Sequence, residues 1–172
     1  VWPAPLGLAE GRGLACGYWF NHGGESSASV HLAEDGTAVV SSGSPDIGGS
    51  RASMAMMAAE TLGLPIEKVR AIVSDTATIG YTFVTGGSRV TFATGMAVVQ
   101  ASQKVMDDLK RRAAMLWECD ASQVAWHDGA AHCTDASKDR PPLTLKDIAG
   151  KSAATGGPIG AEVSLTAQGY SP

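Results

Sequence analysis

The sequence lacks long apolar runs, because none of its hydrophobic stretches approaches the ~18 consecutive apolar residues that a membrane-spanning helix requires. Its first residues also lack the charged start and the apolar centre of a secretory signal peptide. We therefore expect no membrane span and a location in the cytoplasm.

A basic excess and paired cysteines are missing as well. The 13 Lys and Arg against 17 Asp and Glu give a net charge of -4, so the chain has no basic stripe for nucleic acid. Cys16, Cys119 and Cys133 are odd in number and lack C-x-x-C spacing, which argues against a disulfide framework and against structural zinc. The histidines are not at metal-ligand spacing from one another. We predict a reducing compartment and no metal ligands in this chain.

The chain does have enough apolar material for a core, since 44% of its 172 residues are hydrophobic. It begins at Val1 rather than Met and stops directly after a strand-like run, so we expect a piece of a larger subunit. The prolines of residues 1–10 suit an extended linker. We assign residues 1–10 to a connecting segment and residues 11–172 to one domain.

Hydrophobic periodicity predicts an α+β fold with mixed sheets and a few helices. Alternating apolar residues on both sides of Asp35-Gly36 indicate a hairpin over residues 27–41. An Ala/Met-rich helix follows, with Ser50 as its N-cap and Gly63 as its stop. A longer helix comes after Met96, and its predicted apolar face includes Val99.

Each of these helices ends in a short turn and a strand, over residues 62–74 and 117–133, which gives a pseudo-repeated helix-turn-strand unit. Thr144 with Asp147 predicts a capping box for a short helix that ends at Gly156-Gly157. Alternating apolar residues from Ile159 to Ala167 then predict a last strand.

Two glycine-rich loops carry the main functional signal. The first, residues 43–50, and the second, residues 85–91, each lead into a helix. A helix N-terminus offers unpaired N–H groups and a partial positive charge, and neighbouring glycines let the backbone approach a phosphate closely. In the second loop Ser88 and Thr91 add hydroxyls, and Arg89 adds a fork of donors suited to phosphate. Together the loops predict a cradle for an anionic cofactor.

Each pattern also has a purely structural interpretation, in which the glycines only satisfy turn geometry and Arg89 pairs with a local carboxylate. The glycines of residues 11–17 depart from G-x-G-x-x-G spacing and do not predict a dinucleotide site. No serine stands in a nucleophile elbow, and no pair of carboxylates stands out as acid and base. We therefore name no catalytic residue.

Five segments, taken in order, resemble the molybdopterin-binding large subunit of the xanthine dehydrogenase, aldehyde oxidase and aerobic carbon monoxide dehydrogenase family. The resemblance covers roughly residues 11–168. The segments that carry it are Gly11-Arg12-Gly13, Asp35-Gly36-Thr37, Asp46-Ile47-Gly48-Gly49-Ser50, Leu62-Gly63-Leu64-Pro65 and Gly87-Ser88-Arg89-Val90-Thr91.

The resemblance implies that both loops contact the family's molybdopterin-type molybdenum cofactor. In the family the first loop usually reads Glu-Ile-Gly-Gln-Gly, and its glutamine contacts the pterin near the metal. Gly49 stands at that position and removes the side-chain contact, and Val90 stands where a serine is frequent. The implied cofactor-binding residues are Gly48, Gly49, Ser50, Gly86, Gly87, Ser88, Arg89, Val90 and Thr91.

The resemblance also implies part of a molybdenum hydroxylase, an oxidoreductase that hydroxylates a small substrate with oxygen from water. The family's glutamate base lies beyond the matching segment, and iron-sulfur clusters and FAD on partner domains or subunits accept the electrons. We therefore expect this chain to supply part of the cofactor cradle, to need the remainder of the molybdenum subunit as its partner, and to be inactive alone.

Two other functions stay open at this point. A non-catalytic stand-alone domain with the same fold, acting in protein-protein interaction, is favoured by Gly49 and by the missing glutamate. An unrelated enzyme with a phosphate-bearing ligand explains the glycine loops, although it does not explain their order with the hairpin and the helix ends.

Overall fold

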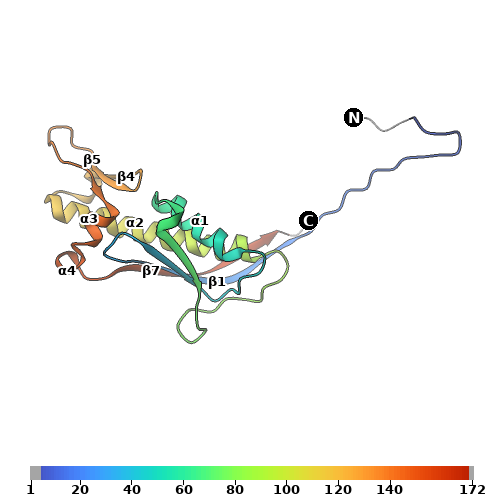
Figure 1. The fold of residues 1–172 in the computed structure, drawn as a ribbon, viewed down its shortest axis with the longest axis horizontal. Helices are drawn as coiled ribbons and strands as arrows, with labels where there is room; N and C mark the ends of the chain where they lie inside the picture. The colour runs from blue at the N-terminus through green and yellow to red at the C-terminus, as the bar shows by residue number, and fades with distance from the viewer. Residues whose placement is uncertain (1–4, 171–172) are drawn as a thin grey trace.

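The body of the molecule begins at Asn21. A computed structural model describes residues 5–170, and residues 5–20 run away from the body as an extended arm without helix or strand (Figure 1). The side chains of the arm are exposed, including those of Leu8, Leu14 and Trp19. The buried core is therefore built by residues that follow the arm.

A four-stranded sheet supports the body. Its strand order is β3-β2-β1-β7, with β1 (Asn21–Leu32), β2 (Ala38–Ser42), β3 (Val69–Val73) and β7 (Ile159–Tyr170). β1 is antiparallel to both β2 and β7, whereas β2 and β3 are parallel. The pairing of β1 with β7 thus joins the first and last strands of the fold.

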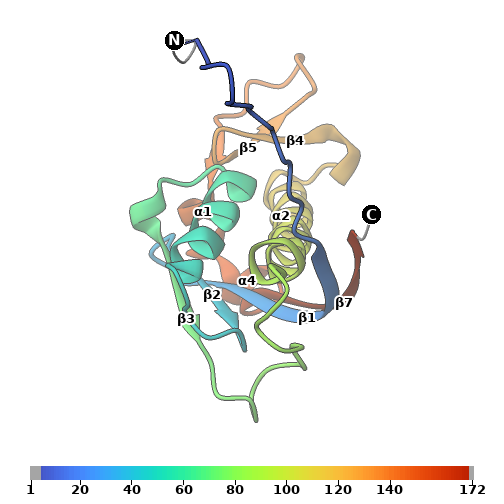
Figure 2. The same cartoon turned by 90° about the vertical axis from the view of Figure 1, so that its right-hand side faces the viewer.

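Two helices, α1 (Ser50–Leu62) and α2 (Gly95–Trp117), cover one face of this sheet (Figure 2). α1 connects the parallel strands β2 and β3 and completes a β-α-β unit. Val30 of β1, Leu62 of α1 and Leu109 of α2 are almost completely buried in one shared core. This packing fixes how the starts of the two helices lie relative to β1.

A smaller antiparallel sheet, with strand order β4-β5-β6, follows α2 and packs against it. Two short helices then lead into β7. The remaining elements are η1 (Ile66–Lys68), η2 (Val90–Thr94), η3 (Ala121–Gln123), β4 (Val124–His127), β5 (Ala130–Cys133), β6 (Leu143–Thr144), α3 (Leu145–Ala149) and α4 (Ser152–Thr155). Within the described residues, no helix has the length and apolar character needed to cross a membrane.

The α+β class with mixed sheets is confirmed. The predicted hairpin places Leu32 opposite Ala38 across its turn. α1 stops at Gly63 in the left-handed conformation (φ 72°), and α2 stops at Glu118 in the same conformation (φ 51°). Both ends continue through a short turn into a strand, so the predicted quasi-repeat is present. Its strands β3 and β4 belong to different sheets, and the repeat is therefore local.

The start of α1 differs from the prediction. Its N-cap is Gly49 (φ 81°) and not Ser50. The Ser50 hydroxyl instead donates to the carbonyl oxygen of Pro45 at 3.2 Å, so it is not available to cap the helix. Glycine fits here because the cap residue has a left-handed backbone.

Two further predictions are wrong in detail. Val99 is 40% exposed, because the buried face of α2 includes Val98 and Val105, although the predicted members Leu109 and Ala113 are buried as expected. The capping box formed by Thr144 and Asp147 is present, but the helix that it starts ends at Gly150, and α4 forms separately.

Candidate functional site

The first glycine loop carries the chain from β2 to the start of α1. Gly48 (φ 66°) and Gly49 (φ 81°) both have left-handed backbones, and a Cβ at either position would meet no atom within 4 Å. Within residues 5–170, the N–H groups of Gly48, Gly49 and Ser50 have no acceptor. The loop thus presents open donors at a helix N-terminus, an arrangement that binds anions.

Asp46 occupies one side of this helix start. One carboxylate oxygen accepts the backbone N–H of Arg51 at 3.1 Å, and the other lies 2.8 Å from Arg51 Nε. The backbone bond from Arg51, followed by the side-chain bond, lowers the pKa of the Asp46 carboxyl below its ordinary value. This carboxylate takes one N–H of the helix and leaves the preceding donors open.

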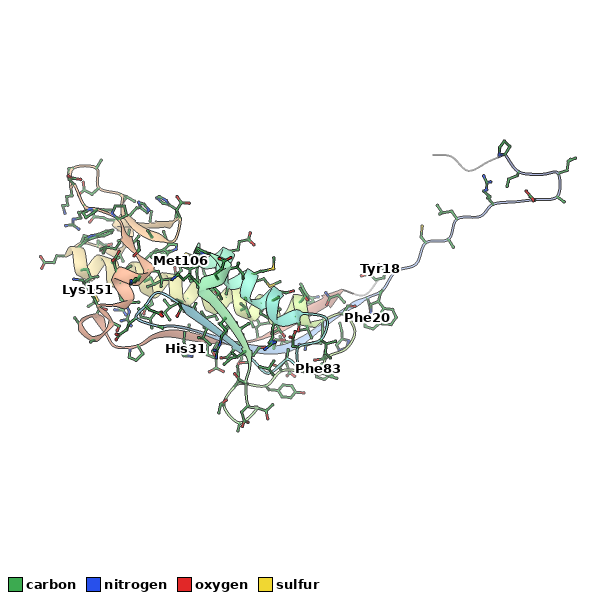
Figure 3. The ribbon with its side chains drawn as sticks, viewed as in Figure 1. Tyr18, Phe20, His31, Phe83, Met106 and Lys151 are labelled. Carbon is green, nitrogen blue, oxygen red and sulfur yellow. The ribbon has the colours of Figure 1, made fainter. Side chains whose placement is uncertain are left out.

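The second loop is fastened to the start of β1. The His22 N–H donates to the carbonyl oxygen of Gly87 at 2.9 Å, and a Cβ at Gly87 would lie 2.8 Å from His22 Cβ. The His22 ring stacks on Phe83 at a centroid distance of 5.6 Å. Phe83 lies near Phe20, close to the beginning of β1 (Figure 3). Gly87 therefore permits the close approach to β1, while a Cβ at Gly86 would meet nothing within 4 Å.

A π-helix, η2, joins this loop to α2. Such wide turns are frequent at functional sites. Ser88, just before it, has a positive φ of 55°, which is an uncommon and costly conformation for a residue other than glycine. In the described part of the chain, the N–H groups from Gly86 to Thr91 have no acceptor. The second loop thus provides a second run of open donors.

Both loops line a single hollow of about 400 Å³. Four hydroxyl side chains, those of Ser50, Thr85, Ser88 and Thr91, are among its lining residues, and no carboxylate is. The complete lining is Ile47 and Ser50 from the first loop, with Thr85, Gly86, Ser88, Arg89, Val90 and Thr91 from the second. The fold therefore joins two anion-binding patterns that lie far apart in the sequence.

The Arg89 side chain takes a role that the sequence did not predict. The residue is only 1% exposed, and its Nε donates to the carbonyl oxygen of Gly23 at 2.5 Å. Its Nη1 donates to Phe83 O at 2.8 Å, and its Nη2 donates to Glu25 O at 2.5 Å and to Ser26 Oγ at 2.6 Å. Burial lowers the pKa of the guanidinium, which stays protonated. The guanidinium thus fastens the second loop to β1, and its acceptors within the described residues are carbonyl oxygens and one hydroxyl rather than a local carboxylate.

An apolar hollow of about 650 Å³ adjoins the first one. Ser88 and Thr91 line both hollows and form the boundary between them. Met57, Phe92 and Val99 contribute to the apolar wall. The outward position of Val99 on α2 is therefore part of a surface beside the glycine loops.

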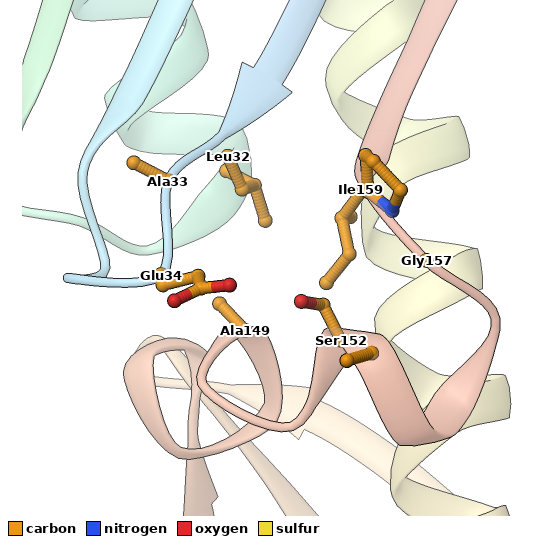
Figure 4. A pocket seen from close by; sticks show the side chains of 9 residues that line it. Leu32, Ala33, Glu34, Ala149, Ser152, Gly157 and Ile159 are labelled. Carbon is orange, nitrogen blue, oxygen red and sulfur yellow. The ribbon is translucent and has the colours of Figure 1, made fainter.

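A third hollow, of about 400 Å³, lies between the end of β1 and the two short helices α3 and α4 (Figure 4). Leu32, Ser152 and Ile159 line it together with the carboxylate of Glu34. It contains no residue of either glycine loop. This hollow is therefore separate from the predicted anion site.

The structure brings most of the predicted binding residues together. Gly48 and Gly49 stand between the lining residues Ile47 and Ser50, whereas Gly87 faces β1. Sequence reasoning missed Ile47, Thr85 and a set of buried hydroxyls beside the loops, at Ser26, Ser44 and Thr94. No sequence signal distinguished these hydroxyls, because serine and threonine are also ordinary residues of strands and turns.

Metal-ligating side chains do not gather around this site. Across residues 5–170, no group of three or more His, Cys, Asp or Glu side chains lies in a position to hold a metal ion. Cys16, Cys119 and Cys133 are each unpaired.

Comparisons with known proteins give similarities of sequence over most of the chain. A family model described as a molybdopterin cofactor-binding domain matches residues 7–172. The nicotine 6-hydroxylase large subunit of Paenarthrobacter nicotinovorans is 28% identical over 148 residues, which cover 83% of this chain and 18% of that protein. The aldehyde oxidoreductase molybdenum-binding subunit PaoC of Escherichia coli (strain K12) is 42% identical over 66 residues, which cover 38% of this chain and 9% of that protein.

A solved structure shares the fold. The Cu,Mo-CO dehydrogenase in its carbon monoxide reduced state superposes with a TM-score of 0.78 and 19% sequence identity, over 88% of this chain and 21% of that chain. At this identity the likeness shows the fold alone. The chain spans about a fifth or less of the length of each of these proteins.

Proposed function

The chain belongs to the family of molybdopterin cofactor-binding domains, and we propose that its two glycine loops hold the phosphate groups of a molybdopterin-type molybdenum cofactor. The whole protein is then a molybdenum-dependent oxidoreductase, in which this chain supplies part of the cofactor cradle. The residues assigned to the cradle are Gly48, Gly49, Ser50, Gly86, Gly87, Ser88, Arg89, Val90 and Thr91.

The convergence of both loops on one hollow carries this proposal. Its donors are open backbone N–H groups and the hydroxyls of Ser88 and Thr91, and these groups suit the acceptor oxygens of a pyrophosphate. Gly49 and Gly86 leave the space beside the backbone open for a bulky anion. The donor set therefore fits the anionic end of the cofactor.

The cradle residues divide into ligand contacts and supports. We assign the open N–H groups of the first loop and of Ser88 to Thr91 to ligand binding, whereas Gly87 and the Arg89 side chain hold the second loop against β1. At Gly49, where the family usually has a glutamine, the left-handed backbone favours glycine. This chain therefore offers a backbone donor there in place of a side-chain amide.

When bound, the cofactor supplies the redox centre at which a small substrate is oxidised or hydroxylated with oxygen from water. The apolar hollow beyond Ser88 and Thr91 offers an adjacent surface to the uncharged part of the ligand. The names of the two relatives, a nicotine hydroxylase and an aldehyde oxidoreductase, support a small organic substrate. The reacting groups belong to the remainder of the molybdenum subunit, so this chain is inactive alone.

The larger assembly follows from the same proposal. Iron-sulfur clusters and FAD on partner domains or subunits carry the electrons away from the molybdenum centre. We assign residues 11–172 to this domain and residues 1–10 to its connection, with the family match beginning at residue 7. A cytoplasmic location suits the three unpaired cysteines, which stay reduced there.

The two alternative functions have less support. A non-catalytic interaction domain is not favoured, because the matched relatives are an oxidoreductase subunit and a hydroxylase subunit. An unrelated phosphate-binding enzyme does not account for a family match over residues 7–172.

Purification from the native host tests the proposal directly. We expect molybdenum, measured by mass spectrometry of the metals, and a pterin, measured by fluorescence after oxidation, to co-purify with this chain. Co-purifying polypeptides are identified in the same sample, and they should include iron-sulfur and flavin proteins. A preparation with neither metal nor pterin would contradict the proposal.

A substitution at Gly86 tests the location of the cradle. Gly86→Leu adds a side chain where a Cβ meets no atom within 4 Å, so it fills the hollow without straining the fold. We expect the pterin content to fall while the thermal unfolding temperature stays within a few degrees. Ala121→Leu, at an exposed position of η3, is the control and should retain the pterin. Equal pterin content in both variants would place the cofactor elsewhere.

A further inference from the structure

Three buried hydroxyls connect the two glycine loops. Thr94 lies at the end of the π-helix. Its Oγ1 forms hydrogen bonds with Ser44 Oγ in the first loop, at 3.0 Å, and with Ser26 Oγ on β1, at 3.1 Å. Ser26, Ser44 and Thr94 are 1%, 4% and 0% exposed, so these hydroxyls do not exchange their partners for bulk water. Thr94 is thus the point where β1 and both loops meet through hydrogen bonds.

Arg89 extends this connection to the second loop. Its Nη2 donates to Ser26 Oγ at 2.6 Å, and a guanidinium can only donate. Ser26 Oγ therefore accepts this bond, while either oxygen can be the donor in the bonds between Ser26 and Thr94 and between Thr94 and Ser44. A buried hydrogen-bond network is costly to break, because its polar groups would lose their partners in a region of low dielectric constant.

The bond between Ser44 and Thr94 is the direct polar link between the loops. In the described residues, no other hydrogen bond joins residues 43–50 to residues 85–94. The remaining bonds of the first loop run within the loop or to Arg51. The spacing between the two runs of open N–H groups therefore depends on Thr94 together with apolar packing.

We propose that Thr94 is a positioning residue, whose hydroxyl holds the two glycine loops at the spacing that a pyrophosphate group requires. This inference rests on the proposed cofactor cradle. Thr94 does not line the hollow and does not touch the ligand. It acts by fixing the donors of the first loop relative to those of the second, so that binding does not have to order them.

Titration of the full chain with inorganic pyrophosphate, followed by calorimetry and by amide NMR shifts, tests this role. Thr94→Val keeps the volume of the side chain and removes both bonds, and we expect at least about tenfold weaker binding. Thr94→Ser keeps the hydroxyl and should restore binding to within about threefold. The matched control is Thr155→Val, because Thr155 is 3% exposed, accepts a bond from Arg112 Nη1 at 3.1 Å and lies in α4.

The outcomes separate this inference from the function on which it rests. If the unaltered chain does not bind pyrophosphate through the two loops, the cradle itself is refuted. If it binds and Thr94→Val binds equally well, or if Thr155→Val weakens binding by the same factor, the positioning role of Thr94 is refuted. Should Thr94→Val fail to fold, Ser44→Ala cuts only the link to the first loop and carries the same expectation of weaker binding.

Discussion

Replacement of Arg89 by alanine provides a direct test of how the second loop is held. The change removes three close bonds to the carbonyl oxygens of Gly23, Glu25 and Phe83 and one to the hydroxyl of Ser26. Each of these four bonds contributes about 1 kcal/mol. Water compensates for part of their loss, and the cavity left by the side chain adds a cost, so we expect the free energy of unfolding to fall by about 4 kcal/mol. That is a large share of the ~5–15 kcal/mol that stabilises a typical domain.

Urea unfolding of the chain, followed by circular dichroism, measures this loss. Arg89→Lys keeps the charge but has a single nitrogen, and we expect it to lose about 2 kcal/mol because one ammonium cannot reach acceptors on both β1 and residues 83–84. Arg51→Ala is the matched control. That side chain is 53% exposed and, within residues 5–170, pairs with Asp46 alone, so its removal should cost under about 1 kcal/mol.

The same experiment decides between two roles for Arg89. If the guanidinium holds the loop, the stability loss is large in Arg89→Ala, and pyrophosphate binding weakens because the donors of the loop lose their positions. If Arg89→Ala lost less than about 1 kcal/mol and yet abolished binding, the guanidinium would act on the ligand directly, and the reasoning from its buried bonds would be refuted.

Further predictions concern glycine geometry and acid stability. Gly63→Ala places a Cβ on a residue with a φ of 72°, and this Cβ would lie 2.6 Å from Gly129 N. Thermal denaturation should therefore show that the free energy of unfolding falls by about 2–3 kcal/mol. Gly49→Ala has open space around its Cβ, so its free energy of unfolding should fall by only about 1 kcal/mol. Equal losses in the two variants would contradict the role of the close approach at Gly63. The pKa of Asp46 is lower in the folded state than its ordinary value of 3.8. The bonds to Arg51 therefore stabilise the fold at pH values above 3.8, and this stabilisation is lost as the pH falls through the lowered pKa. Asp46→Asn should therefore destabilise the chain at pH 7 more than at pH 3 in urea titrations, and an equal effect at both pH values would refute this linkage.

Local sequence signals predicted those elements whose cause is also local. Gly63 ends α1 because only a residue tolerant of a left-handed backbone closes that helix end, and the Thr144–Asp147 capping box forms between residues three apart. The alternation along β7 predicted a strand, because successive side chains of a strand point to opposite faces. In each case the interaction lies within a few residues of the signal.

Predictions failed where contacts with a neighbouring segment determine the orientation or the first residue of a helix. The apolar face of α2 was assigned to include Val99, but the rotation of the helix is set by packing of Val98 and Leu109 on the sheet and on α1. Ser50 has a favourable N-cap side chain, yet the bond from its hydroxyl to Pro45 O and the left-handed backbone of Gly49 move the cap by one residue. Residue propensity is a weak guide when tertiary packing competes with it.

The sequence by itself determined the α+β class, the hairpin, the two helices and the presence of two glycine-rich loops, because periodicity and glycine placement encode short-range geometry. Only the tertiary structure decided that the loops meet in one hollow, that the Arg89 guanidinium binds acceptors on β1, and that Thr94 bonds to Ser44 in the first loop. The physical reason is distance along the chain. The partners of Arg89 and Thr94 lie on β1 and in the first loop, and nothing in a local pattern specifies which distant acceptor a buried donor meets.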